Sequence, residues 1–398
     1  MRKRASRIRS FALTAGIAAL AGLFGSAAQA QQPVCSAWLI ESSRFMNVPF
    51  GSFMPDRTFV PGSTKPESNI PSVDLPVNVG VIKCGSELIL YDTGWKQQDY
   101  LKMTGSDHWA PIADQLKVLG FNAADVTKVV IGHAHWDHAG QLSDLPNAVL
   151  YVQREELKSI EWALNYPEPH IRAVNSDPGG CNRTPACGYM PLTMEEVYGK
   201  VLKGKAVILD GETEILPGVR IHPAFRAHTA GSQLLEVPTS IGKLVFGSDA
   251  FSSYEGIRDW MTANVQQTDT VQQFLAYEKC YKITGGYNNC VAAHEPLSYT
   301  DKYPLTKNSW VALNGGRMAE LTLAPGEKSR KPGEVFSGWD QSSHPDRFNP
   351  GREENKSACV GWPSGLPAWC PFWPAARHRM TRAAMAACFV PVISAPPG

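Results

Sequence analysis

Three histidines and one aspartate lie within six positions of one another, in the segment HAHWDHAG at residues 133–140. They are His133, His135, Asp137 and His138. Zinc in proteins prefers imidazole nitrogen and carboxylate oxygen, and a catalytic zinc keeps one coordination position open. Four such groups packed together without a cation would lose their hydration with no compensation. The segment therefore predicts a catalytic metal site.

The segment is expected at the end of a buried strand. Val126–Ile131 is short and rich in β-branched residues, which is typical of such a strand, and Gly132 follows it. The three histidines and the aspartate would then occupy the loop where the strand stops. Only a tight bend in that loop lets all four side chains converge.

The pattern His133-x-His135-x-Asp137-His138 resembles the signature of the metallo-β-lactamase superfamily. Further motifs of that family can be matched in the same order, so the resemblance covers about residues 35–325. They are Asp92 in Tyr-Asp-Thr-Gly, His228 in Arg-Ala-His-Thr-Ala-Gly-Ser, Asp249 in Phe-Gly-Ser-Asp-Ala, and His294 in Val-Ala-Ala-His-Glu-Pro. The segment around His228 departs from the family pattern, since alanines replace its usual glycine and proline.

The resemblance implies an α/β fold, the four-layer αββα sandwich, with two zinc ions (Zn2+) per chain. His133, His135 and His228 would hold one ion, Asp137, His138 and His294 the other, and Asp249 would bridge both. Two metals about 3.5–4 Å apart make hydroxide available near neutral pH, and this hydroxide would attack an acyl carbon. Asp249 or Asp137 would pass the proton to the leaving group. Asp92 would orient a metal ligand from behind.

Among the branches of the superfamily, the chain is most similar to the N-acyl-homoserine lactonases. Zinc β-lactamases usually have a cysteine at the position of Asp249 and lack a histidine at that of His138. Glyoxalase-type and RNA-processing branches usually carry basic residues near the last ligand, whereas His294 is followed by Glu295. The mononuclear iron persulfide dioxygenases fit an exported protein less well. Val152–Glu156 looks like a segment of the lactonases.

Aromatic residues near these motifs are candidates for substrate contact. A lactonase often has a tyrosine shortly after the bridging aspartate that touches the substrate carbonyl. Tyr254 is the candidate, although it lies two positions later than the pattern predicts, and it could equally be a surface aromatic. Trp136 and Trp260 could line an apolar pocket, or pack in the core as tryptophans more often do.

Three hypotheses for function remain open. The first is a dizinc lactonase or esterase acting on a small neutral organic substrate. The second is a hydrolase of the same fold that attacks another electrophile: a phosphotriester, a carbamate or an aryl halide. The third is a non-catalytic metal-binding or redox protein, against which the complete ligand set argues. Because dimerisation is common among the lactonases, the resemblance also implies a homodimer.

Alternating strand-like and helix-like segments from Trp38 to about Leu323 predict a layered α/β domain at residues 35–327. Strands are expected at 77–83, 87–91, 126–131, 148–152, 205–209, 219–222 and 243–246, and helices at 112–119, 154–164 and 268–281. Residues 165–199 are rich in proline and glycine, which favours a long loop, either a lid over the site or a surface insertion. Residues 328–398 show little periodicity and are expected to form a poorly ordered tail.

The N-terminal 30 residues are typical of a secretory signal peptide. A cationic start precedes an apolar run from Phe11 to Phe24, and small residues up to Ala30 follow it. The apolar run is shorter than the roughly 20 residues that a membrane span needs, so no stable membrane insertion is expected. The mature protein would begin near Gln31 and be periplasmic or secreted. An uncleaved anchor is the alternative.

Nine cysteines favour an oxidising compartment. Cys35 would lie near Cys84 if the strands that carry them pair antiparallel. Cys181 with Cys187, and Cys280 with Cys290, flank short loops and are the other candidate pairs. The sequence leaves connectivity open, and some of these residues could be buried free thiols.

Composition excludes some partners. Hydrophobic residues make up 43% of the 398 residues, which is enough for a large core. The net charge is +1, and no basic run occurs after the first ten residues, so no nucleic acid partner is expected.

Overall fold

The computed structural model describes residues 33–49, 72–106, 108–165, 188–262, 269–330, 333, 335 and 336. All of them belong to one compact unit that ends at Ser343. Three predicted features lie outside the described residues. They are the signal peptide, the cysteine pair Cys181 and Cys187, and the part of the expected tail at residues 337–398.

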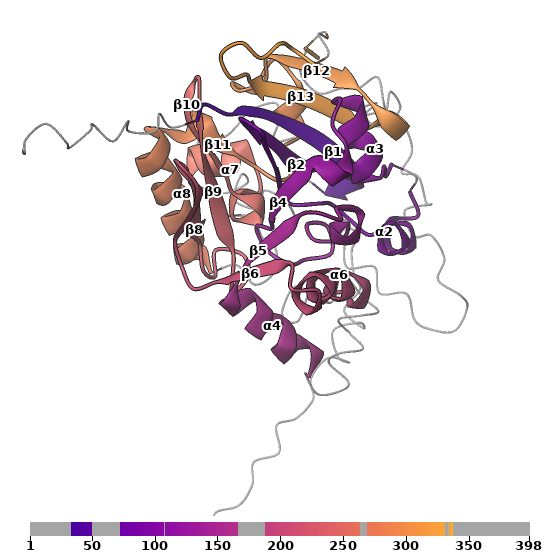
Figure 1. The fold of residues 1–398 in the computed structure, drawn as a ribbon. Helices are drawn as coiled ribbons and strands as arrows, with labels where there is room; N and C mark the ends of the chain where they lie inside the picture. The colour runs from indigo at the N-terminus through magenta and orange to yellow at the C-terminus, as the bar shows by residue number, and fades with distance from the viewer. Residues whose placement is uncertain are drawn as a thin grey trace, which may run out of the picture. The chain divides into compact units, whose positions relative to one another are not determined.

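Two β-sheets form the centre of the domain (Figure 1). The larger sheet has the strand order β12 (Asn308–Val311), β13 (Arg317–Thr322), β1 (Ser36–Pro49), β2 (Ser72–Cys84), β3 (Glu87–Tyr91), β4 (Val126–Val130), β5 (Val149–Gln153), β6 (Ala206–Leu209). The smaller sheet has the order β11 (Cys290–Val291), β10 (Gly242–Phe246), β9 (Gln233–Thr239), β8 (Val219–Pro223), β7 (Thr213–Leu216). Strands β3 to β6 run parallel to one another, as do β10 and β11.

The central strands carry apolar residues on both sides in the parts where both of their faces are covered. In β1, Trp38 and Ile40 face one group of helices, whereas Ala37 and Leu39 face the second sheet. In the smaller sheet, neighbours such as Leu244 and Val245 divide in the same way between the inter-sheet core and the opposite helices. This follows from the alternation of side chains along a strand.

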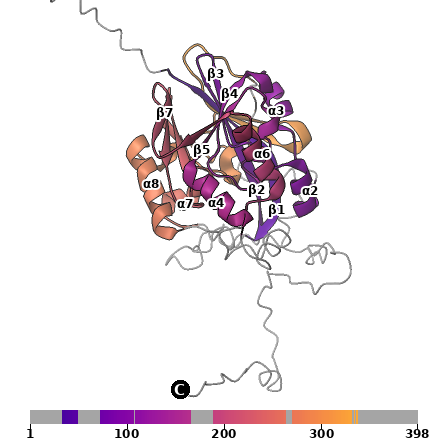
Figure 2. The same ribbon diagram turned by 60° about the horizontal axis from the view of Figure 1, so that its bottom comes forward.

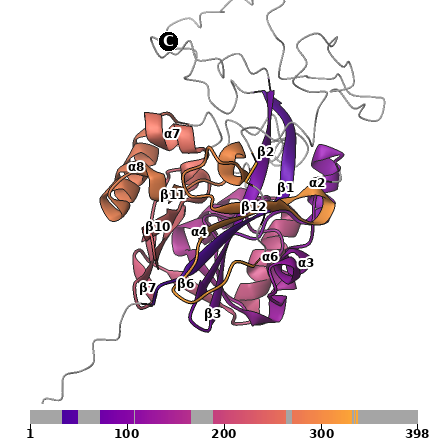
Figure 3. The same cartoon turned by 90° about the horizontal axis from the view of Figure 1, so that it is seen from above.

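Helices cover the outer face of each sheet (Figures 2 and 3). The α-helices in the described part of the chain are α2 (Gln97–Thr104), α3 (Ile112–Val118), α4 (Arg154–Leu164), α6 (Pro191–Leu202), α7 (Tyr254–Asp259) and α8 (Thr270–Thr284). Apolar residues of α3, α4 and α6 share a core with the larger sheet, and those of α7 and α8 with the smaller one. The order helix, sheet, sheet, helix confirms the predicted αββα sandwich. None of the described helices has the length and apolarity needed to span a membrane.

The predicted strands and helices are found with small shifts at their ends. The prediction of a loop at residues 165–199 is wrong at its C-terminal end, because Pro191–Leu202 forms α6. Pro191 is the first residue of this helix, where a backbone N–H would have no partner in any case, so proline is tolerated there. Residues 166–187 lie outside the described part of the chain.

Within the expected tail, the Arg330 guanidinium lies 4.4 Å from the centre of the Phe121 ring.

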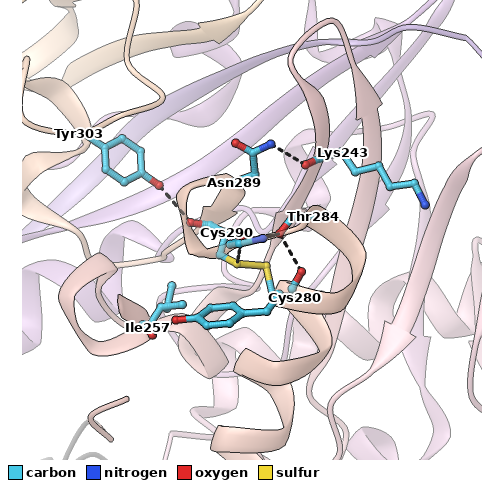
Figure 4. The surroundings of a disulfide bond; sticks show 9 residues. Lys243, Ile257, Cys280, Thr284, Asn289, Cys290 and Tyr303 are labelled. Atoms are coloured by element: carbon cyan, nitrogen blue, oxygen red, sulfur yellow. Dashed lines mark hydrogen bonds between the residues drawn. A yellow bond between two sulfur atoms is a disulfide. The ribbon is translucent and has the colours of Figure 1, made fainter. Parts of the chain in front are cut away.

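Two of the expected disulfides are formed in the described part of the chain. Cys35 and Cys84 join the start of β1 to the end of β2 across the larger sheet. Cys280 of α8 is bonded to Cys290 at the start of β11 (Figure 4). Around this second bond, Tyr303 donates to the Cys290 carbonyl and Asn289 to that of Lys243, so β11 is held beside α8 and β10.

Replacement of Cys35 and Cys84 by alanine is expected to lower the free energy of unfolding by about 2–5 kcal/mol. The bond closes a loop between residues 49 positions apart, and this restricts the unfolded chain. The matched variant without Cys280 and Cys290, which are 10 positions apart, should lose less. Urea unfolding of both variants and the wild type measures this. An unchanged midpoint without Cys35 and Cys84 would contradict the prediction.

Candidate metal centre

The structure brings together all seven side chains that the sequence predicted as metal ligands. His133, His135, His228 and Asp249 form one group, and Asp137, His138 and His294 form a second. Within each group, the candidate ligand atoms lie within 4.8 Å of one another, and every residue is buried. We call the first three histidines the three-imidazole group and the second set the mixed group.

The seven side chains lie on loops that follow strands of both sheets. Residues 133–138 follow β4 of the larger sheet, and His228 lies between β8 and β9 of the smaller one. Asp249 and His294 follow β10 and β11, which are parallel neighbours, so their loops leave the sheet at the same edge. The centre is therefore complete only when the two sheets are packed together.

Gly132 allows the loop after β4 to pass close to the loop after β10. A Cβ atom at this position would lie 2.1 Å from the Cβ of Ser248 and 2.7 Å from the Tyr91 hydroxyl. Any larger residue would push the two loops apart. Gly132 is thus needed for the close approach of the two loops.

The Asp249 carboxylate lies between the two groups. Its Oδ2 is 3.2 Å from His228 Nε2, in the three-imidazole group. Its Oδ1 is 2.9 Å from His294 Nε2 and 3.2 Å from His138 Nε2, in the mixed group. One carboxylate thus has an oxygen directed at each group, which is the arrangement of a ligand shared by two cations.

Several buried atoms of the centre have no hydrogen bond among the described residues. These include Nε2 of His133 and Nε2 of His138, although the latter lies within 3.3 Å of the Asp137 carboxylate. In the same centre, His135 Nδ1 and His228 Nε2 lie 3.1 Å apart. Buried polar atoms are nearly always paired. Unpaired nitrogens that converge with carboxylates fit a pair of zinc ions, whose preferred ligands these are.

The electrostatics of the centre favour a positive charge next to its carboxylates. Burial opposes protonation of His294, but the Asp249 and Asp137 carboxylates outweigh it and raise its pKa to about 10. The same two carboxylates raise the pKa of His138 against its burial. By contrast, burial and the neighbouring imidazoles lower the pKa of His133. The carboxylates therefore favour the positively charged form of both imidazoles.

Asp92 orients the centre from behind, as predicted. Its Oδ2 lies 2.9 Å from His138 Nδ1, and its Oδ1 accepts a hydrogen bond of 2.6 Å from Gly132 N–H. Similarly, His294 Nδ1 lies 2.8 Å from the Pro76 carbonyl oxygen, which can only accept. When these imidazoles are neutral, both must then carry the proton on Nδ1, which leaves their Nε2 lone pairs directed into the centre.

Ser248 was not predicted from the sequence. Its hydroxyl donates to Asp92 Oδ2 over 2.8 Å and lies 3.1 Å from His133 Nδ1. Ser248 thereby connects the aspartate behind the centre to a histidine of the three-imidazole group. Its position directly before Asp249 was the available signal, but a serine there is uninformative without the contact.

The aromatic candidates lie in different surroundings. The Tyr254 hydroxyl donates to Asn288 Oδ1 over 2.8 Å, and its ring packs against Tyr303, so its contact with a substrate stays a prediction. Trp136 is buried beside Trp95, in the core rather than in an open pocket. Trp260 is 43% exposed.

Comparison with known proteins agrees with the fold and the centre. Residues 73–277, just over half of the 398-residue chain, match the model of the Metallo-beta-lactamase superfamily. The N-acyl homoserine lactonase AttM of Agrobacterium fabrum is 54% identical over 43 residues, which are 11% of this chain and only 16% of that relative. The N-acyl homoserine lactonase of Bacillus cereus is 26% identical over 229 residues, 53% of this chain and 77% of the relative.

The solved structure of AidC, described as a dizinc quorum-quenching lactonase in complex with a product, has a TM-score of 0.50 and 17% sequence identity. The match covers 75% of this chain and 97% of AidC, and at this identity it shows the fold alone. The family match over residues 73–277, the αββα sandwich and the buried centre of histidines and aspartates lead to one assignment. The chain belongs to the metallo-β-lactamase superfamily.

Proposed function

We propose that this protein is a metal-dependent hydrolase that opens a lactone or cleaves an ester in a small neutral organic substrate. The observation that carries the proposal is the pair of buried ligand groups that share the Asp249 carboxylate. His133, His135 and His228 would hold one zinc ion, and Asp137, His138 and His294 the other, with Asp249 between them. The relatives named above are N-acyl homoserine lactonases, which supports a lactone as the substrate.

A pair of bound zinc ions would lower the pKa of water at the centre and polarise the substrate carbonyl. Side chains of the protein have to transfer one proton from the attacking water to the leaving oxygen. The oxygen of water bonds to the acyl carbon, the ring C–O bond breaks, and the released oxygen takes up the proton that the water has lost. The Asp137 carboxylate, or that of Asp249, would hold this proton between the two steps, and both belong to the buried ligand groups. Tyr254 is a candidate contact for the carbonyl oxygen if its hydroxyl leaves Asn288.

We further propose that the protein acts in the periplasm or outside the cell. The N-terminal pattern of charged, apolar and small residues supports export. The two disulfides support an oxidising compartment, since such bonds persist there and are rare in the cytosol. The homodimer is proposed from the resemblance to lactonases alone.

Removal of metal from the full chain with a chelator is expected to abolish hydrolysis of a panel of lactones, including N-acyl-homoserine lactones. It should also lower the melting temperature, because ions that bind only the folded state stabilise it. Added zinc should restore both. The panel also contains a phosphotriester, a carbamate and an aryl halide. Turnover of one of these with no turnover of any lactone would contradict the proposed substrate. Lactone turnover that survives complete metal removal would contradict the mechanism.

Replacement of Asp92 by asparagine is expected to weaken zinc binding by about 10- to 100-fold. The asparagine oxygen can still accept from Gly132 N–H, but its amide group would then face His138 Nδ1–H, and two donors cannot pair. Competition with a chromophoric chelator measures the affinity. Asp210→Asn is the control, because that carboxylate is exposed and paired with Arg154. Equal affinities of the Asp92 variant and this control would refute the role of Asp92.

A further inference from the structure

Glu156 is a fully buried carboxylate beside the metal centre for which neither the sequence nor the proposed mechanism has a role. It lies in the first turn of α4 and accepts hydrogen bonds from four donors. Ala134 N–H and the Tyr189 hydroxyl donate to Oε1 over 2.7 and 3.1 Å. The Thr229 hydroxyl and Gly231 N–H donate to Oε2 over 2.7 and 2.9 Å.

Three of these four donors come from the two loops that supply the three-imidazole group, and the fourth, Tyr189, lies just before α6. Ala134 lies between His133 and His135, and Thr229 directly follows His228. The second loop lies against the start of α4, since a Cβ atom on Gly231 would be 2.3 Å from the Glu156 backbone nitrogen. A single side chain therefore joins the two loops at the level of their ligands.

The position of Tyr189 extends the same arrangement. Its ring packs edge to face on His135, with ring centres 5.2 Å apart, while its hydroxyl is bonded to Glu156. Asp92, by contrast, bonds directly to His138 of the mixed group. Asp92 reaches the three-imidazole group only through Ser248, whereas Glu156 bonds to the backbone and side chains next to the ligands of that group.

We propose that Glu156 is a positioning residue that sets the metal affinity of the three-imidazole group and leaves that of the mixed group largely unchanged. The inference rests on the proposed function, since it requires two metal ions. A glutamine at this position has one acceptor oxygen, whereas Ala134 N–H and Gly231 N–H approach different oxygens of Glu156. The two hydroxyls can rotate and accept, but a backbone N–H cannot. Glutamine must therefore release one of the two loops.

The test is zinc titration of the metal-free full chain, in which stoichiometry and affinity are measured by competition with a chromophoric chelator. The wild type is expected to bind two ions. Glu156→Gln should bind one ion as tightly as the wild type and the other about 10- to 100-fold more weakly. The matched control is Glu155→Gln, which removes a charge from the same helical turn at an exposed residue paired with Lys158. This control should bind both ions as the wild type does.

Double variants identify the affected group. Added to His294→Ala, which removes a ligand of the mixed group, Glu156→Gln should weaken the remaining zinc. Added to His228→Ala, it should change nothing further. Equal weakening of both ions by Glu156→Gln, or no weakening, would overturn the inference. A wild type that binds no zinc would instead overturn the proposed function.

If Glu156→Gln does not fold, Tyr189→Phe decides. This change removes one donor to the carboxylate and keeps the ring on His135. It should weaken the same single ion about 2- to 10-fold, as expected for the loss of one hydrogen bond, with an unchanged circular dichroism spectrum. Binding of both ions as in the wild type would reject the proposal.

Discussion

Five imidazoles and two carboxylates converge in the interior of this domain, and the positive charge that they require constrains the rest of the structure. Burial alone would disfavour every ionised form. The carboxylates nevertheless raise the pKa of His294 to about 10, which reflects their demand for positive charge. Since the ligands come from loops of both sheets, that demand is satisfied only in the folded sandwich. Metal binding and folding are therefore linked.

The architecture meets this constraint by placing short loops at the ends of rigid strands. β4 of the larger sheet and β10 and β11 of the smaller one all end at the centre, and glycine permits the closest approach between their loops. Behind the ligands, Asp92 and Glu156 accept hydrogen bonds from backbone and side chains alike. These fixed acceptors hold the loops that carry the imidazoles in place, so the binding of a metal ion would need little reorganisation.

The local parts of this design could be predicted from the sequence. The dense spacing of His133 to His138 predicted four ligands, and the later motifs added three more through their resemblance to a family. The alternation of strand-like and helix-like segments predicted the layers, because sheets and helices must bury their apolar faces against one another. The helix at Pro191–Leu202 was not predicted, since proline is a signal both for loops and for the first turn of a helix.

Residues that act through long-range contacts could not be predicted. Ser248 and Glu156 are ordinary polar residues in the sequence, and their roles depend on loops that only the folded chain brings near them. The same holds for Tyr254, whose hydroxyl is bonded to Asn288, 34 positions away. Substrate choice belongs to this class, because segments distant in the sequence build a binding pocket.

The Cys35–Cys84 bond closes a covalent ring that contains β1 and β2. A protease that cuts the chain once anywhere inside this ring leaves the two pieces joined, and the ladder between the two strands keeps them in register. None of the seven ligands lies within the ring. The two pieces of a molecule cut in this way would therefore stay covalently joined until the disulfide is reduced. The centre would persist in a chain that is no longer continuous.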